Sequence, residues 1–254
     1  HSGEQGNQNY LRPEFVKALV EKVTGTVVEC NTAYPGARNT TEKHRKLMDE
    51  HEWTKYFDVD IMDAEGPDME LDIPNGLQIK KNYVGKDLAN YDSMVVLSHF
   101  KGHAMGGYGG ALKQLSIGCA SSYGKAYIHG AGDASADMFA TDQLSFVTAM
   151  GDAASSVHKY FNGNIVYLNA MVNISIDCDC DGNASAPCME NIGILASTDP
   201  VAIDQACLDL IYNSNDPGKD KLIARIEDRK GIHIIETAAE LGVGSREYEL
   251  INVD

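Results

Sequence analysis

The pattern of apolar and polar positions along the chain predicts alternating helices and strands. Residues 12–23 repeat apolar side chains at helical spacing, whereas residues 92–100 contain an apolar run typical of a central parallel strand. Residues 69–76 carry turn signals. Further helices are predicted over 41–53, 111–115, 141–161, 199–213 and the charged tail 220–241, and further strands over 25–30, 57–63, 77–84, 164–176, 190–197 and, as an edge strand, 248–253.

This alternation predicts an α/β fold with a mostly parallel sheet and helices on both faces. In such sheets ligands bind beyond the carboxyl ends of the strands, and polar loops follow Phe100 and Ile176 at two such ends. The 254 residues can bury one large core. We therefore expect one domain over 1–254, or alternatively two lobes over 1–135 and 136–254.

Acidic residues outnumber basic ones, which limits the partners that the protein can bind. With 37 Asp and Glu against 21 Lys and Arg, the net charge is −16, and such a surface repels phosphate backbones and anionic lipids. A run of about 18 apolar residues, as a membrane-spanning helix needs, is absent from the sequence. We expect a small-molecule substrate, and neither a nucleic acid nor a membrane, as the partner.

The cysteine content and the first residue bear on the compartment and on the extent of the chain. Six cysteines are too few for a disulfide scaffold at this length, which predicts reduced thiols and a cytoplasmic location. The sequence opens on His1 rather than Met and without a signal-like segment. We therefore expect the true N-terminus to lie outside it.

The loop that follows Phe100 combines glycines with cationic and titratable side chains. Its glycines would let backbone N–H groups approach a ligand, and the short helix after them would present an N-terminus that favours anions. Lysine and histidine are groups that handle a carboxylate or a metal ion. The spacing fits neither the dinucleotide fingerprint nor a P-loop, and a glycine-rich packing turn is the alternative interpretation. Candidate catalytic residues are Lys101, His103 and Lys113, and candidate substrate-binding residues are Gly106, Gly107, Gly109, Gly110 and, from an earlier loop, Arg38.

A second polar loop, later in the chain, interleaves acidic residues with cysteines. Cys178 and Cys180, with Asp177 and Asp179 beside them, are candidate ligands for zinc, iron or nickel. The same stretch has the D-x-D-x-D-G head of a calcium loop, but Cys188 stands at the twelfth position, where a bidentate Glu is expected. Buried, unreactive thiols in a polar loop are the third interpretation.

Several motifs resemble one known family. SHFKGH, GGYGGALK, GCASSYGK, DCDC and IGILASTDPVAIDQA are similar to blocks of domain-of-unknown-function family 362, whose bacterial and archaeal members are often described as iron–sulfur-centre proteins. The resemblance covers almost the whole chain, and the activity of the family is not established. Many members carry a ferredoxin-like insert with two C-x-x-C-x-x-C-x-x-x-C-P runs soon after the GK, and this sequence has no such run. We therefore expect no ferredoxin-type cluster.

A more distant resemblance concerns the mechanism. His103, Lys113 and His129 are spaced like three residues of the nickel-pincer lactate racemases. In that family the Lys anchors the pincer cofactor, one His takes the substrate proton and the later His binds nickel. By this resemblance His103 is a candidate base and His129 a candidate metal ligand.

Three hypotheses for the function remain open. The first is a metal-dependent isomerase or other proton-transfer enzyme, racemase-like, that acts on a small carboxylate-bearing substrate. The second is a metal-binding or electron-transfer accessory protein without catalysis of its own, and the third is a calcium-binding module. Nickel, iron or zinc is the ion expected in the first two, and calcium in the third. The first hypothesis requires the two polar loops to meet at one edge of the sheet and form a shared pocket.

Overall fold

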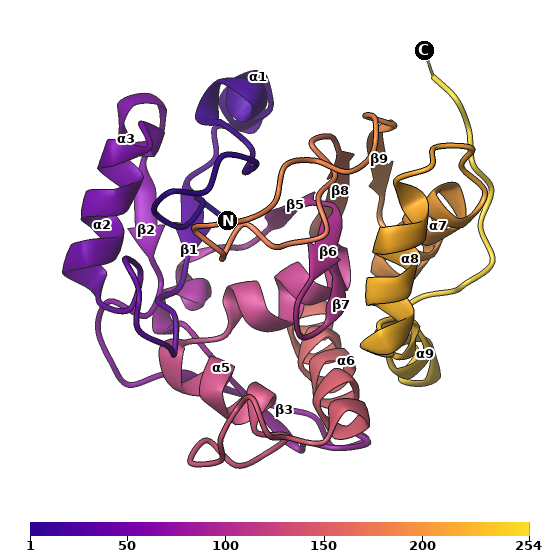
Figure 1. Ribbon diagram of the computed structural model, residues 1–254. Coiled ribbons are helices and arrows are strands. Elements are labelled where there is room, and N and C mark those ends of the chain that lie inside the picture. The colour runs from indigo at the N-terminus through magenta and orange to yellow at the C-terminus, as the bar shows by residue number, and fades with distance from the viewer. Residues whose placement is uncertain (254) are drawn as a thin grey trace.

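The computed structural model describes residues 1–253 and shows a mixed α/β fold (Figure 1). The strands are β1 (Val27–Glu29), β2 (Val59–Ile61), β3 (Met69–Asp72), β4 (Lys81–Val84), β5 (Met94–His99), β6 (Lys101–His103), β7 (Gly107–Gly109), β8 (Ile165–Met171) and β9 (Gly193–Ser197). The helices are α1 (Pro13–Val23), α2 (Thr41–Glu50), α3 (Trp53–Tyr56), α4 (Ala111–Lys113), α5 (Ser122–His129), α6 (Gln143–Phe161), α7 (Pro200–Tyr212), α8 (Lys219–Asp228) and α9 (Ile232–Glu240). A 3-10 turn, η1 (Lys86–Asn90), precedes β5, and a π-helical turn, η2 (Gln114–Gly118), continues α4.

The strands form small sheets rather than one mostly parallel sheet, so that part of the predicted fold is not confirmed. Strand β1 pairs with β2 in parallel, and β5 pairs with β8 in parallel while β9 runs antiparallel beside β8. Strands β3 and β4 form an antiparallel pair, and β6 and β7 form a hairpin. The α/β class is confirmed, but its parallel strands lie in two separate sheets.

Three of the expected helices are confirmed to within two residues at each end, because capping signals mark where they begin. Helix α1 begins with Pro13 at its first position, and Asp142 accepts a hydrogen bond from Ser145 N at the start of α6. Asp199 accepts from Val201 N and Ala202 N at the start of α7, which also has Pro at its first position.

Other expectations were wrong. Strand β3 occupies residues 69–72, where the sequence indicated a turn, and its alternate half-buried and exposed positions match its pairing with β4. The edge strand expected over 248–253 does not form, since Leu250, Ile251 and Val253 are 55%, 68% and 90% exposed and have no neighbouring strand among the described residues. The β6–β7 hairpin and helix α5 were not expected at all.

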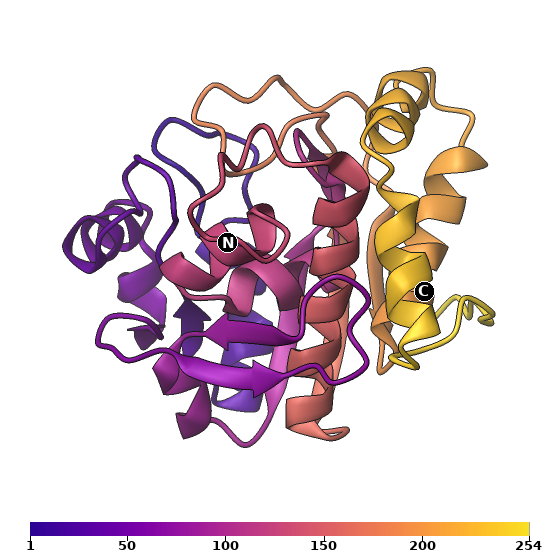
Figure 2. The ribbon, with the colours of Figure 1, turned by 90° about the horizontal axis from the view of Figure 1, so that it is seen from below.

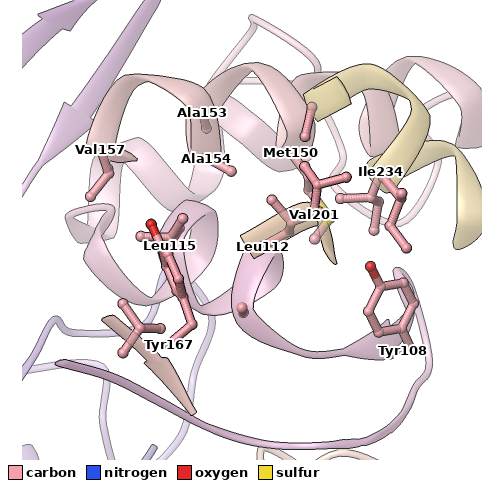
Figure 3. Close-up of a cluster of buried hydrophobic side chains, with 14 of the residues drawn as sticks. Tyr108, Leu112, Leu115, Met150, Ala153, Ala154, Val157, Tyr167, Val201 and Ile234 are labelled. Carbon is pink, nitrogen blue, oxygen red and sulfur yellow. The ribbon is translucent and has the colours of Figure 1, made fainter. Parts of the chain in front are cut away.

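One large hydrophobic cluster runs through the molecule, and the long helix α6 crosses it (Figure 3). Figure 3 shows Ala153 and Ala154 of α6 above Leu112, and these small side chains let the two helical segments approach closely. On its other side α6 meets α9 at Gly151, where a Cβ would lie 2.5 Å from Thr237 Cγ2. Figure 2 shows the C-terminal helices α7 to α9 gathered on one side of the molecule. None of the helices over residues 1–253 is long and apolar enough to cross a membrane.

Candidate functional site

A pocket of about 240 Å³ lies between the loop after β1, the start of the β6–β7 hairpin, the α4–η2 turn and helix α5. Its wall also includes the cysteine loop, so the two polar loops do meet. The ionisable side chains that line this pocket include Arg38, His103, Lys113, Lys125, His129 and Cys180. Three residues chosen from sequence spacing, His103, Lys113 and His129, therefore share one pocket.

Three soft donor atoms gather at one end of this pocket. The ligand atoms of His103, Cys178 and Cys180 all lie within 4.8 Å of one another, and His103 Nε2 is 4.0 Å from Cys180 Sγ. A histidine with two cysteines is a donor set that suits zinc, iron or nickel. The structure thus brings His103 to the cysteines, whereas His129 is not one of these three donors.

The hydrogen bonds of His103 restrict how this ring could bind a metal ion. Its Nδ1 accepts from the backbone N–H groups of Gly106, at 2.9 Å, and Met105, at 3.2 Å. The neutral ring therefore carries its proton on Nε2, the atom that faces the cysteines. The two sulfur atoms fit a metal ion directly. The imidazole fits only when its proton moves to Nδ1, which requires both amides to turn away.

Burial and neighbouring charges separate the two thiols. The pKa of Cys178 lies well below its usual range because Cys180 donates a hydrogen bond to it, because Lys113 adds positive charge and because His103 also donates a hydrogen bond to it. The pKa of Cys180 is raised well above its usual range by the same hydrogen bond and by burial. Of the two thiols, Cys178 is therefore the one on which negative charge is favoured.

An ionic network underneath the cysteine loop fixes its position. Asp179 accepts from Lys101 Nζ at 2.7 Å and pairs with His99 Nδ1 at 3.0 Å, and all three side chains are buried. Burial alone would raise the pKa of Asp179, but Lys101 and His99 outweigh burial and hold it at about 2. His99 Nε2 donates to Val172 O at 2.6 Å. Lys101 and Asp179, predicted as a catalytic and a metal-binding residue, instead bind each other outside the pocket lining.

The N-terminal segment also holds the cysteine loop. Glu4 N donates to Asp179 O at 2.8 Å, and the Asn7 amide donates to Asp181 O at 2.8 Å and to Cys178 O at 3.3 Å. In Figure 1 the N-terminus lies beside this loop, drawn in orange. Hydrogen bonds between residues 170 or more positions apart in sequence therefore hold the backbone that carries both sulfur atoms.

The acidic residues of the calcium-like head do not converge. Asp177 turns toward Arg225, at 3.6 Å, and accepts from Ser185 N at 3.1 Å. Asp181 accepts a hydrogen bond from Asn183 N at 2.8 Å, and Asp179 forms an ion pair with Lys101. Within residues 1–253 these carboxylates form no cluster of metal-binding oxygens.

His129 ends helix α5 with its ring buried against Phe146, at a ring distance of 4.9 Å. Its Nδ1 donates to Lys125 O at 2.7 Å, so the lone pair of the neutral ring is on Nε2. Burial lowers the pKa of His129 to about 4. The ring is therefore neutral at pH 7 and has the tautomer that a base or a metal ligand needs.

Four cationic side chains lie in or near the pocket, and they differ in how far they are neutralised. Arg38 is buried and donates through Nε to Glu4 at 3.2 Å. Lys125 is buried and donates to Ala120 O at 2.5 Å, and burial lowers its pKa. Lys101 is paired with an acid, as described above. Lys113 is half-buried, and its ammonium group has neither a hydrogen bond nor an ion pair with any residue in the described part of the chain. Lys113 is thus the cation best able to bind an anionic ligand.

The glycines of the hairpin serve packing rather than the pocket lining. A Cβ at Gly110 would lie 2.5 Å from Asp204 Oδ1, and this carboxylate accepts from Ala111 N at 2.7 Å, Leu112 N at 3.0 Å and Tyr108 OH at 3.1 Å. Gly107 has φ +81° in the hairpin turn. Of the four glycines predicted to bind substrate, Gly106, Gly107, Gly109 and Gly110, none lines the pocket.

One pocket residue was missed in the sequence. Lys125 ends the GCASSYGK motif, but the motif alone does not show that helix α5 turns this side chain inward. A lysine within a motif of small residues was the available signal. Tyr34, which belongs to the same loop after β1 as Arg38, also lines the pocket, and its hydroxyl lies 3.5 Å from the Arg38 guanidinium.

The fold and this pocket define a mixed α/β protein with a histidine–cysteine site. Residues 1–209 match the family model described as Domain of unknown function (DUF362), and the chain belongs to this family. No curated protein and no solved structure matches the chain, and the resemblance to nickel-pincer lactate racemases is not shown.

Proposed function

We propose that the protein is a metal-dependent enzyme that moves a proton on a small carboxylate-bearing substrate. One observation carries this proposal: the donors of His103, Cys178 and Cys180 lie within 4.8 Å of one another beside a pocket that also contains Lys113 and His129. Soft donors, a free cation and a neutral imidazole in one cavity are the groups that such a reaction requires.

The proposed metal ion is held mainly by the two thiolates. Cys178 and Cys180 supply sulfur, and His103 supplies nitrogen once the amides of Met105 and Gly106 release its Nδ1. Metal binding requires both thiols to be deprotonated, so binding strengthens as pH rises. When bound, the ion supplies positive charge next to the substrate, which stabilises negative charge that develops there.

We assign the binding of the substrate carboxylate to Lys113. Its ammonium group has no hydrogen-bond or ion-pair partner among residues 1–253, and it lines the pocket. Arg38 adds a second positive charge, although Glu4 already accepts from its Nε. A cavity of about 240 Å³ limits the substrate to a small molecule. Met105, Met138 and Phe139 give one side of the cavity an apolar wall.

We assign the removal of the substrate proton to His129. Its Nδ1–H donates to Lys125 O, which leaves the Nε2 lone pair for a substrate proton. The pKa of about 4 makes the ring a weak base in the empty pocket. A bound anionic substrate would raise that pKa, because negative charge nearby favours the protonated ring.

Exchange of the substrate proton with solvent tests this assignment. The protein, purified without chelator, is incubated in D2O with a panel of small 2-hydroxy and 2-amino acids, and proton NMR follows loss of the C–H signal beside the carboxylate. We expect exchange with at least one acid and at least a hundredfold loss in His129→Gln. His233→Gln, a partly exposed histidine on α9, is the matched control. If His129→Gln exchanges the substrate proton as fast as the unchanged protein, the assignment is contradicted.

A second candidate function is thiol chemistry without a metal ion, and the tautomer of His103 favours it. Because Nδ1 accepts two backbone N–H groups, Nε2–H can donate to sulfur and stabilise a thiolate. Alkylation of the metal-stripped protein by iodoacetamide distinguishes this candidate. It predicts faster alkylation in the Cys178 and Cys180 peptide than at Cys188, and slower alkylation in His103→Ala. Equal rates at all these cysteines would contradict it.

A further inference from the structure

One buried lysine of the candidate pocket has no part in the proposed proton transfer. Lys125 is only 6% exposed, and it lines the pocket together with Lys113 and His129. Its Nζ donates one hydrogen bond, to the carbonyl oxygen of Ala120, and forms no ion pair with any residue from 1 to 253. Because a lysine side chain is seldom buried without an acidic partner, this amine is a candidate for chemistry of its own.

The two acidic side chains whose charge acts on Lys125 are bound to other groups. Asp63 accepts from two backbone N–H groups, both at 2.8 Å. Glu29 accepts from the Ser2 hydroxyl at 3.2 Å and lies 3.0 Å from His44 Nε2. Neither carboxylate is therefore committed to holding the proton of the Lys125 amine.

The surroundings of the Lys125 amine favour its neutral form. Burial lowers its pKa and outweighs the acidic neighbours, and the guanidinium of Arg38 acts in the same direction. Burial raises the pKa of the nearby thiols of Cys30 and Cys119, that of Cys119 to about 12, so neither thiol is negatively charged at pH 7. A desolvated lysine beside another cation is the kind of amine that reacts as a nucleophile.

Helix α5 places this amine beside the groups assigned to the substrate. Lys125 and His129 are four residues apart on α5, so both side chains lie on one face of the helix. Lys113, to which we assign the substrate carboxylate, lines the same pocket. A 2-oxo acid has its carbonyl group next to its carboxylate, and it therefore offers one group to each lysine.

We propose that Lys125 forms an imine with the carbonyl carbon of a 2-oxo acid whose carboxylate is bound by Lys113. This inference rests on the proposed function, because it uses the same pocket and the same assignment of the carboxylate. The amine nitrogen bonds to the carbonyl carbon, and the carbonyl oxygen leaves as water with both amine protons. Once the imine nitrogen is protonated, the adjacent C–H proton passes to His129 Nε2, and the electron pair of that bond moves toward nitrogen to give an enamine.

Reductive trapping tests the imine directly. The protein as purified is incubated at pH 7 with pyruvate and sodium cyanoborohydride, which reduces an imine to a stable secondary amine, and peptide mass spectrometry identifies the modified lysines. We expect Lys125 to be modified first. We expect it to react roughly tenfold faster with pyruvate than with methyl pyruvate, which keeps the carbonyl group but lacks the charge that Lys113 binds. Lys101, which is as deeply buried but paired with Asp179, is the matched control and should stay unmodified.

Three results overturn the proposal: no adduct on Lys125, an adduct that forms first on an exposed lysine such as Lys46, or equal trapping by pyruvate and methyl pyruvate. Lys125→Arg keeps the positive charge and a donor for Ala120 O but cannot form an imine, so it should lose the adduct. The same yield of adduct in Lys125→Arg also overturns the proposal.

The trapping experiment separates this inference from the proposed function. If Lys125 traps pyruvate but no acid exchanges its C–H proton in D2O, the proposed proton transfer is wrong and the imine stands. If acids exchange their protons but Lys125 traps nothing, the imine is wrong and the proton transfer stands.

Discussion

Two buried aspartates hold the two sides of the candidate site, and they do so in opposite ways. Asp179 holds the cysteine loop through an ion pair with Lys101 and a hydrogen bond with His99 Nδ1. Asp204 holds the hairpin and α4 through neutral donors only, which include Tyr108 and Asn169. Both carboxylates are fully buried. The pKa of Asp179 is about 2, whereas burial raises that of Asp204 to about 6.

The difference shows that burial alone does not decide the charge of a carboxylate. Lys101 and His99 hold the pKa of Asp179 at about 2, so the loop of Cys178 and Cys180 rests on a carboxylate that is charged at neutral pH. Asp204 relies on hydrogen bonds that do not fully offset its desolvation. On the metal-donor side of the pocket, Asp179 is thus stabilised by an ion pair. On the Lys113 side, Asp204 is stabilised only by hydrogen bonds from neutral groups.

The largest effect is expected from Asp179→Asn. This change leaves the Lys101 ammonium buried without a compensating negative charge, so we expect a loss of about 3–5 kcal/mol in the free energy of unfolding. Urea denaturation measures it. The double variant Lys101→Met with Asp179→Leu should lose less than Asp179→Asn alone, because it leaves no unpaired lysine ammonium in the interior. A loss below about 1 kcal/mol in Asp179→Asn contradicts the charge-paired side of the comparison.

A smaller effect is expected from Asp204→Asn. The asparagine keeps one acceptor oxygen, but its NH2 group faces donors such as Ala111 N or Leu112 N, and we expect a loss of about 2 kcal/mol at pH 7. Asp58→Asn, an exposed position, is the control. If Asp204→Asn destabilises as strongly as Asp179→Asn, the two sides do not differ as we describe.

The two aspartates should change the free energy of unfolding in opposite directions as pH rises. The low pKa of Asp179 gives stability that is present above its ordinary value near 4 and is lost as pH falls toward 2. The raised pKa of Asp204 means that the folded state binds its proton more tightly, so stability falls as pH rises from about 4 to about 6. Urea titrations across pH 4–6.5 should show this decline in the wild type and a weaker one in Asp204→Asn.

The smallest effect is expected from Asp177→Asn. Its pair with Arg225 spans 3.6 Å and is about a quarter exposed on both sides, so we expect a change of less than about 1 kcal/mol. We also expect no change in metal content, since Asp177 is not one of the grouped donors. Loss of bound calcium from Asp177→Asn, measured by elemental analysis, would favour the calcium hypothesis instead.

Local signals in the sequence predict the helices well and the sheets poorly. Pro13, Asp142 and Asp199 mark helix starts through their own chemistry, so α1, α6 and α7 lie where expected. The pairing of β5 with β8 and the separation of β1 from β5 depend on contacts distant in sequence, which periodicity does not contain. Helix α5 was missed because its small and polar residues show little apolar periodicity.

The candidate site shows the same division between local and distant information. Clustered histidines and lysines indicated His103 and Lys113, the racemase-like spacing indicated His129, and these three residues do line one pocket. The sequence could not show which histidine lies beside the cysteines, because that depends on how Glu4 and Asn7 hold the distant loop. It also could not show that Lys101 neutralises Asp179, since an acidic residue beside cysteines has the same pattern whether it binds a metal or a lysine.

The most direct test of the central claim is the sulfur coordination of a bound metal ion. X-ray absorption on protein loaded with Ni²⁺ or Zn²⁺ should show about one ion per chain with two sulfur ligands, at about 2.3 Å for zinc. This signal should vanish in the double variant Cys178→Ala with Cys180→Ala and persist in Cys188→Ala. A metal spectrum that lacks sulfur, or one that survives the double variant, would contradict the account.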